Sequence, residues 1–178
     1  MRKANGIITV IIIVLFVIHG IAGTFLMSGI GSSALKPLAG VTACLVAVHT
    51  VLGVILTLRS VMVWRRTGVG YFKENRMFWA RRISGAAVMA LLLVHMTVIS
   101  TKVDSVVRLQ EFTTAKLVLQ ILFVAALAVH IISNAKPLLI TFGIKSFKSR
   151  AAEIIIIMSV ILVVMAAGFV VYWVRWNA

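Results

Sequence analysis

Five long apolar segments constrain the fold of this chain more than any other feature. They cover about residues 5–28, 38–59, 83–101, 116–140 and 152–174. A helix needs roughly 20 apolar residues to cross a bilayer core of about 30 Å, and each segment is long enough. None shows the period-2 alternation of a barrel strand, and backbone groups in lipid must be satisfied within the segment. The sequence therefore predicts an all-α membrane protein with five transmembrane helices.

The composition agrees with one membrane-embedded domain, residues 1–178. Hydrophobic residues make up 62% of the chain, which is above the share in a soluble domain. The N-terminal stretch MRKANGIITVIIIVLFVIHG has the charged start and apolar run of a signal peptide, but the run is long enough to span. We expect it to be retained as the first helix. Cys44, the only cysteine, lies within a span, so no disulfide framework is expected.

Lysine and arginine are distributed unevenly between the two ends of the spans. The net charge of +14 does not predict nucleic-acid binding, because the basic residues cluster between apolar spans and suit anionic lipid headgroups better. Of the 18 basic residues, thirteen fall on the side of the N-terminus and of the 59–82 connecting segment, and five on the other. The positive-inside rule then predicts an inner (cytoplasmic) membrane protein with a cytoplasmic N-terminus and an outer C-terminus.

Four histidines lie one in each of the first four spans: His19, His49, His95 and His130. Counting 1.5 Å per residue from the flanking basic residues puts His19 and His95 roughly 20–24 Å from the cytoplasmic side. The same count puts His49 and His130 roughly 20 Å from the outer side. The sequence thus predicts an outer pair and an inner pair, with roughly one or two helical turns between the two levels.

Paired histidines on different helices are typical of haem iron ligated by two imidazoles, with apolar walls holding the porphyrin. A membrane histidine is also often a packed residue bonded to a neighbouring helix, or a proton relay. Four histidines paired by depth, with none in a connecting segment, favour ligands. Zinc prefers four converging ligands, which two separate levels prevent. We therefore expect two haem b groups, with Thr50 and Ser133 as candidate partners for a ring N–H.

The ordered set of four histidine-bearing spans, together with FWARRISGAAVMALLLVH (Phe78–His95), resembles a known family. This is the dihaem cytochrome b membrane-anchor subunit of succinate dehydrogenases and fumarate reductases. The resemblance implies a haem-binding four-helix bundle plus one additional helix, and His49 and His130 as ligands of the proximal haem. His19 and His95 would ligate the distal one. It also implies a flavoprotein and an iron–sulfur subunit on the cytoplasmic face, and no catalytic dicarboxylate site on this chain.

The resemblance also suggests roles for some charged residues. Arg82 and Lys136 are the candidates for binding haem propionates. A quinone, usually menaquinone in dihaem members, would bind near the distal haem, and Asp104 and Glu111 are outer-side acids that could exchange protons with it or lie solvated. Some members carry a glutamate two residues before the fourth histidine for transmembrane proton transfer. This chain has Ala128 there, so that pathway is not expected.

Two other functions remain open at the level of sequence. A cytochrome b anchor of another oxidoreductase, such as a hydrogenase or formate dehydrogenase, typically places two ligands on one helix, a pattern absent from this sequence. A non-haem transporter would use membrane histidines as a relay, but usually shows broken helices or internal repeats. Neither pattern is found, so the sequence favours electron relay between a cytoplasmic iron–sulfur subunit and membrane quinone.

Overall fold

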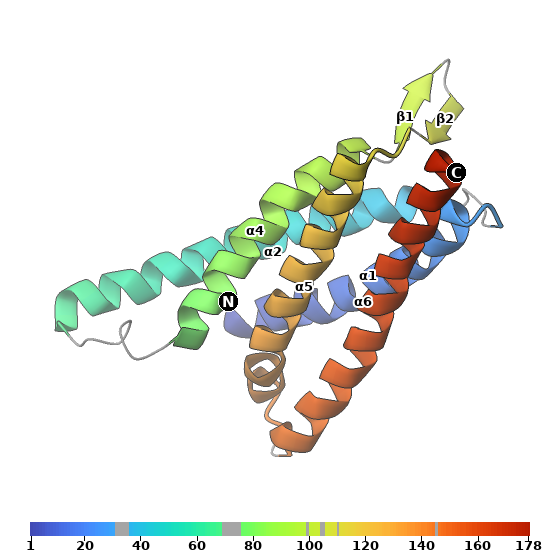
Figure 1. Ribbon diagram of the computed structural model, residues 1–178. Coiled ribbons are helices and arrows are strands. Elements are labelled where there is room, and N and C mark those ends of the chain that lie inside the picture. The colour runs from blue at the N-terminus through green and yellow to red at the C-terminus, as the bar shows by residue number, and fades with distance from the viewer. Residues whose placement is uncertain (31–35, 69–75, 99, 104–105, 110, 145) are drawn as a thin grey trace.

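The computed structural model describes every residue except 31–35, 69–75, 99, 104–105, 110 and 145. Among the described residues, five helices are long and apolar enough to cross a membrane. They are α1 (Arg2–Met27), α2 (Lys36–Thr67), α4 (Arg76–Val98), α5 (Thr114–Thr141) and α6 (Phe147–Asn177) (Figure 1). The predicted all-α fold with five helices long and apolar enough to span a membrane is confirmed, apart from one short hairpin.

The helices on either side of the 59–82 segment are longer than predicted. α2 continues to Thr67 and α4 already begins at Arg76, so both ends of this basic segment are helical. The arginines, methionine and tryptophan near the end of α2 tolerate a helix, and no proline interrupts them. α2 ends just before Gly68, whose φ of +65° is readily adopted only by glycine.

The third predicted span, 83–101, is wrong at its C-terminal end. α4 ends at Val98, and Ser100–Val103 forms strand β1. β1 pairs antiparallel with β2 (Val106–Leu109), so that the first residue of β1 lies opposite the last residue of β2. The β-branched residues in this stretch favour extended backbone. The predicted span extends to Thr101 because Lys102 is the first charged residue after the apolar run.

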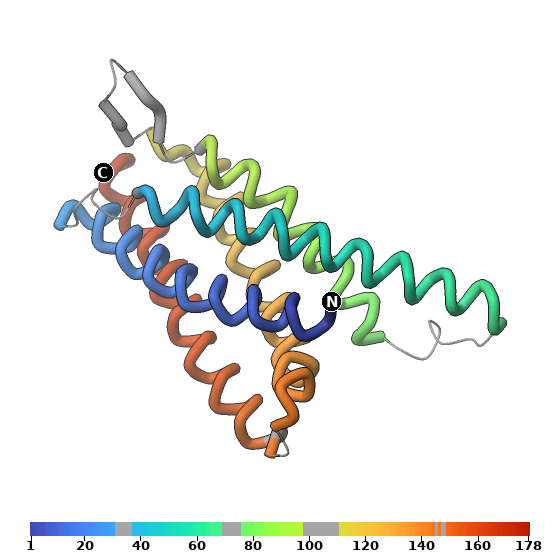
Figure 2. The backbone as a smooth tube through the Cα atoms, turned by 180° about the vertical axis from the view of Figure 1, so that it is seen from behind, coloured from blue at the N-terminus to red at the C-terminus, as the bar shows by residue number. Residues whose placement is uncertain are grey.

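The helices converge at one end of the molecule and spread apart toward the other. The hairpin, the C-terminus and the C-terminal end of α1 lie together, and we call this the hairpin end (Figures 1 and 2). α4 packs against α5, α5 against α6, and α1 against both α2 and α6. The far part of α2 extends away from the other helices, as the view from behind shows (Figure 2).

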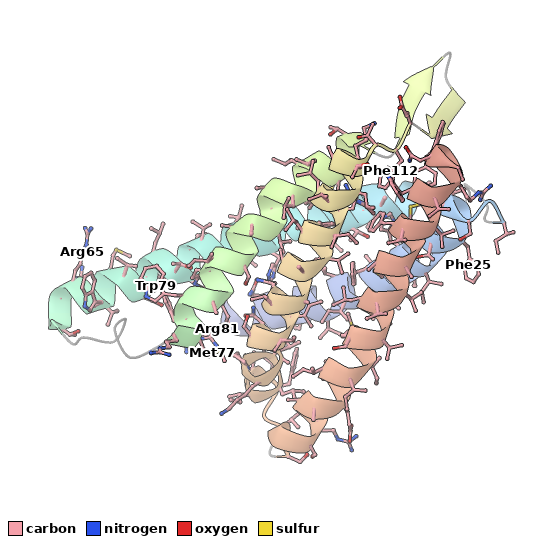
Figure 3. The ribbon with its side chains drawn as sticks, viewed as in Figure 1. Phe25, Arg65, Met77, Trp79, Arg81 and Phe112 are labelled. Atoms are coloured by element: carbon pink, nitrogen blue, oxygen red, sulfur yellow. The ribbon has the colours of Figure 1, made fainter. Side chains whose placement is uncertain are left out.

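The tightest packing lies at the hairpin end. Met27, Phe112, Phe169 and Tyr172 form a buried apolar cluster there, and Phe112 is fully buried. Figure 3 shows Phe112 beside the C-terminal part of α6, with the labelled basic residues on the opposite end. Large apolar side chains are exposed along all five helices, as expected where lipid rather than protein covers a helix face.

Candidate metal centres

His19 on α1 and His95 on α4 face each other near the hairpin end. Their ring centroids lie 6.3 Å apart, and their ring planes are inclined by 84°. The two residues are 76 positions apart in the chain, so only the packing of the helices brings them together. The depth count predicts this pair and assigns it to the outer level.

His49 on α2 and His130 on α5 form a second pair of the same geometry. Their centroids lie 6.4 Å apart, with an angle of 87° between the ring planes. This is the predicted inner pair. The structure thus pairs the same histidines that the depth count pairs. Their role as metal ligands stays a prediction.

The spacing of both pairs suits two imidazoles on opposite sides of one metal ion. In such an arrangement the centroids are about 6 Å apart, because a metal–nitrogen bond is about 2.0 Å and the ring centroid lies roughly 1 Å further on. Each ring can rotate about its metal–nitrogen bond, so nearly perpendicular planes are compatible with this geometry. The two pairs therefore have the dimensions of two axial ligand sets.

The number of donors suits a metal that brings its own equatorial ligands. Among the described residues, no group of three or more His, Cys, Asp or Glu side chains is placed to hold a metal ion. Structural zinc takes four protein ligands, so two histidines alone do not fit a zinc site. A porphyrin supplies four nitrogens and leaves only the two axial positions to the protein, so two histidines per site fit haem.

Hydrogen bonds fix the tautomer of His49. Its Nδ1 lies 3.2 Å from Oγ1 of Thr9 on α1. The Thr9 hydroxyl donates its only proton to the carbonyl of Asn5, at 2.8 Å. It can therefore only accept from His49, whose proton must sit on Nδ1. The lone pair on Nε2 is left free to bind a metal.

His130 is held in the same way by α4. Its Nδ1 lies 3.2 Å from Oγ of Ser84, and this hydroxyl donates to the carbonyl of Ala80 at 2.6 Å. Because the Ser84 hydroxyl donates its only proton to Ala80, it can only accept from His130, whose Nδ1 must carry a proton. Gly85 leaves room for the ring, since a Cβ there would lie 3.2 Å from Cε1 of His130. Both rings of the inner pair thus present an unprotonated Nε2.

His95 has a different partner, a buried amide. Its Nδ1 lies 2.8 Å from Oε1 of Gln120 on α5, which is 1% exposed. A carbonyl oxygen only accepts, so this ring also carries its proton on Nδ1. Phe123 and Phe169 lie against the imidazole, with ring centroids at 5.2 and 6.3 Å. The ring of its partner His19 forms no hydrogen bond with the described residues, so the outer pair is held mainly from one side.

The partners that the structure gives to the rings differ from those expected from the sequence. Thr50 donates to Val46 and to the sulfur of Met89, and Ser133 donates to the backbone carbonyl of His130. Neither contacts a ring nitrogen, so that expectation was wrong. Both were chosen because they lie close to a histidine along the chain, whereas each ring is held by a different helix.

The two levels are further apart than predicted. Thr9, Ser84 and Gln120 each mark the level of the histidine that they contact. Each of these residues shares its helix with a histidine of the other level: Thr9 with His19, Ser84 with His95 and Gln120 with His130. The two lie ten or eleven residues apart, which is about 15 Å along the helix. The predicted distance between the levels, one or two turns, was too small. The depth count takes Arg82 as the membrane interface, but α4 begins at Arg76, so Arg82 lies inside the helix.

Arg82 lies on α4 beside the inner pair. It lies two residues before Ser84 and three before Gly85, which both face the ring of His130, and its guanidinium carbon lies 5.1 Å from the ring centroid of Phe78. Its Nε is buried and has no hydrogen-bond partner among the described residues. A buried donor without an acceptor is costly, so this atom marks a place for an anionic group.

The other predicted charged residues are further from the rings or not described. Lys136 is exposed near the end of α5, six residues beyond His130. Glu111 is exposed at the hairpin end, where its backbone carbonyl accepts from Lys116 at 2.6 Å. Asp104 lies outside the residues that the structure describes.

Replacement of Gln120 by leucine is expected to weaken the outer site alone. The Nδ1–H of His95 would lose its acceptor in a buried place, and losing such a partner typically reduces metal affinity about 10–100-fold. A spectroscopic redox titration should show one haem with a raised midpoint potential and the other unchanged. Gln120→Glu, a stronger acceptor, should lower that same potential, because it makes the imidazole a more basic ligand. Equal shifts of both haems, or of neither, would contradict this role.

The chain has no match among known proteins in the comparisons made. No family model, no curated protein and no solved structure matches it. The fold and the two histidine pairs therefore define the class on their own. The chain has five helices long and apolar enough to span a membrane, and two pairs of histidine rings at different heights between them.

Proposed function

We propose that this protein is a dihaem cytochrome b membrane anchor that relays electrons between a cytoplasmic flavoprotein and iron–sulfur pair and membrane quinone, as in succinate dehydrogenase or fumarate reductase. One observation carries the proposal: two histidine pairs, each from two different helices, have centroids 6.3 and 6.4 Å apart. The haem-binding four-helix bundle consists of α1, α2, α4 and α5, which supply one ligand each, and α6 is the additional helix. Bound haem supplies one-electron chemistry that side chains alone lack.

The residues of the chain have separate tasks in this function. The four histidines would hold the two haem irons, and Thr9, Ser84 and Gln120 fix the rings of His49, His130 and His95 in a tautomer that leaves Nε2 free. The apolar side chains around the rings exclude water and so help to set the potentials.

Arg82 binds a haem propionate of the inner site in this proposal. The support is its unpartnered buried Nε and its place on α4, two residues before Ser84, which contacts His130. A guanidinium pairs with a carboxylate through strong, charge-assisted hydrogen bonds. Lys136 is the second candidate, and it lies further from the inner pair, exposed on α5 six residues beyond His130.

The cytoplasmic subunits dock at the end opposite the hairpin. The support is the distribution of basic residues, thirteen against five, which puts the N-terminus inside and the C-terminus outside. The last turn of α2 carries the exposed Arg65 and Arg66, and α4 begins on the same side with the exposed Arg76; Arg65 is labelled in Figure 3. The inner pair then lies nearer the electron-exchanging partner, and the outer pair nearer the outer surface.

Quinone, with menaquinone as the expected type, exchanges electrons beside the outer pair. Trp173 supports this placement, because its indole Nε1 is buried and has no acceptor among the described residues. The side chain packs against the apolar cluster of Met27, Phe112, Phe169 and Tyr172 at the hairpin end. An apolar surface with one unused donor suits a flat ring that carries carbonyl oxygens. Glu111 is exposed at the same end and is available for proton exchange.

The direct test is a tagged chain purified with its partners from native membranes in mild detergent. Succinate should reduce both haems, and a reduced complex should be reoxidised by fumarate or by a menaquinone analogue. Malonate, which competes with succinate, is the control and should block reduction by succinate only. Haems that respond to hydrogen or formate instead would assign the chain to another oxidoreductase. A preparation from intact membranes that contains no haem would favour the transporter function.

A further inference from the structure

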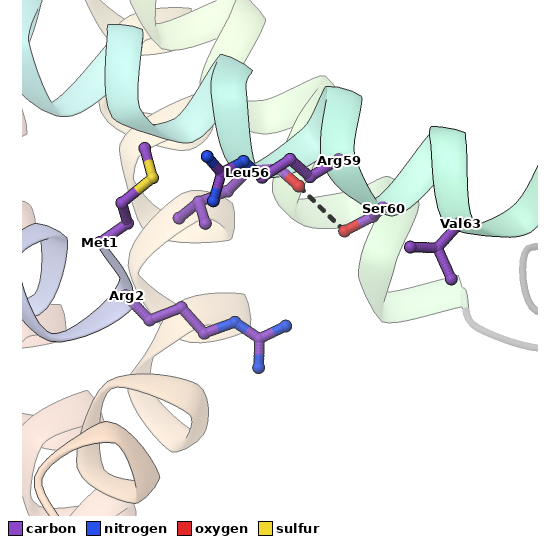
Figure 4. Close-up of a pocket in the computed structure, with 6 residues that line it drawn as sticks. All are labelled: Met1, Arg2, Leu56, Arg59, Ser60 and Val63. Carbon is purple, nitrogen blue, oxygen red and sulfur yellow. Dashed lines mark hydrogen bonds between the residues drawn. The ribbon is translucent and has the colours of Figure 1, made fainter.

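A second candidate site lies away from the histidines, between the start of α1 and the middle of α2. It is a cavity of about 250 Å³ lined by Met1, Arg2, Leu56, Arg59, Ser60 and Val63. The four α2 residues are spaced i, i+3, i+4 and i+7, so they form one face of the helix, and this face is turned toward the start of α1. Figure 4 shows the Arg2 side chain extending alongside these α2 residues.

The charge of this cavity is positive and uncompensated. Arg2 and Arg59 are both exposed, and neither forms an ion pair or hydrogen bond with the described residues. The ion pair found in the described part of the chain joins Arg150 and Glu153, which lie at the start of α6. Two guanidinium groups from two helices at one cavity suit a phosphate, which accepts several charge-assisted hydrogen bonds.

The depth of the cavity matches that of lipid headgroups. The Thr9–His49 contact fixes the relative height of α1 and α2. Arg2 lies seven residues before Thr9 and Arg59 ten residues beyond His49, which is roughly 10–15 Å toward the same surface. Both arginines therefore lie where a helix leaves the apolar core, the level at which phosphates of the leaflet are found.

The remaining lining residues suit the apolar part of a lipid. Met1 and Val63 are 46% and 59% exposed, and Leu56 is partly exposed. The Ser60 hydroxyl donates to the carbonyl of Leu56 at 2.9 Å, so it has no proton left for an anion (Figure 4). The recognition of a phosphate therefore falls to the two arginines, and the contact with glycerol and acyl groups to the three apolar residues.

We propose that this cavity binds the phosphate of an anionic phospholipid and thereby joins the cytoplasmic ends of α1 and α2. The start of α1 also packs against the end of α5, where a Cβ on Gly6 would lie 3.2 Å from the side chain of Thr141, whereas α2 diverges from the other helices beyond this point (Figure 2). A bridging phosphate would hold together two helices that each carry a histidine. The site uses none of the haem-binding residues and does not depend on the proposed electron relay.

The test compares two double variants that lose the same charge. Arg2→Gln/Arg59→Gln removes the two cavity arginines, and Arg65→Gln/Arg66→Gln removes two exposed arginines from the last turn of α2. Native mass spectrometry of the full chain, titrated with phosphatidylglycerol in a neutral detergent, gives the affinity for the first bound lipid. Wild type and the Arg65/Arg66 variant should bind alike. The Arg2/Arg59 variant should bind at least about tenfold more weakly, because it loses two charge-assisted contacts.

Two further titrations identify the source of the phosphate. Phosphatidylcholine should bind more weakly than phosphatidylglycerol to wild type, and millimolar inorganic phosphate should not displace the lipid. Displacement by inorganic phosphate, abolished in the Arg2/Arg59 variant, would keep the anion site but assign it to free phosphate. Equal loss of lipid in both double variants, or no loss in either, would overturn the proposal. Haem content can be measured on the same samples, so failure of this site is distinguishable from failure of the haem sites.

Discussion

Pairwise replacement of the histidines is expected to remove haems by site rather than by the number of histidines lost. A His95→Ala chain should keep one haem of two, and His19→Ala/His95→Ala should also keep one, because both ligands belong to the same iron. His95→Ala/His130→Ala should keep none, because it breaks both pairs. Haem affinity should fall by more than the roughly 10–100-fold that is typical when only a hydrogen-bond partner of a metal ligand is removed.

Haem per chain, measured by pyridine haemochrome, distinguishes these variants. Two double variants with the same number of substitutions serve as controls for each other, since one lies within a pair and the other crosses the pairs. Added imidazole should partly restore the missing haem in His95→Ala, which separates loss of a ligand from misfolding. A within-pair variant that loses both haems while the cross-pair variant retains one would show that the pairing is wrong.

A leucine at Gly85 should remove the inner haem while leaving the outer one. A Cβ at this position would lie 3.2 Å from Cε1 and 3.4 Å from Nδ1 of His130, so the ring has to give way even before the rest of the side chain is placed. The ring is held by Ser84 and cannot move without losing its Nδ1 hydrogen bond. The inner pair would then lose the geometry that two axial ligands need.

Haem counts and a second substitution identify the haem that Gly85→Leu removes. Gly40→Leu is the control, since a Cβ on Gly40 meets nothing within 4 Å, and it should keep two haems. Gly85→Leu combined with His130→Ala should keep one haem, and combined with His95→Ala it should keep none. Two haems in Gly85→Leu itself would mean that His130 does not need the space that this glycine leaves.

The pairing of the histidines follows from the sequence because helix rise is nearly constant. Once the spans are placed, the height of His19, His49, His95 and His130 is fixed to within a few ångströms. The five helices and the two pairs could therefore be predicted without a structure. The spacing between the levels could not, because Arg82 lies inside α4 rather than at its end.

The partners of the rings depend on helix rotation as well as height. Thr9, Ser84 and Gln120 lie at the right heights, and counting by depth would have selected them along with other polar residues of the spans. Which of these faces a histidine depends on how the helices are turned, and the spans are too uniformly apolar to reveal this. Proximity along the chain selected Thr50 and Ser133 instead, and was misleading.

The hairpin and the true helix ends were missed for a related reason. Ser100 and Thr101 follow an apolar run without a charge and are therefore included in the predicted span, but they fold as the start of strand β1. The basic residues of 59–67 mark the membrane surface, yet they do not stop a helix, which continues until Gly68. Hydropathy locates the membrane, whereas the ends of helices are set by backbone preferences.

The haem content of the wild-type chain tests the central claim most directly. The protein should be purified in mild detergent from cells supplied with haem, and its haem counted by pyridine haemochrome beside reduced-minus-oxidised spectra. The two histidine pairs predict two b-type haems per chain, both reducible. A well-folded chain that contains no haem would contradict the account, and the paired histidines would then need a function without iron.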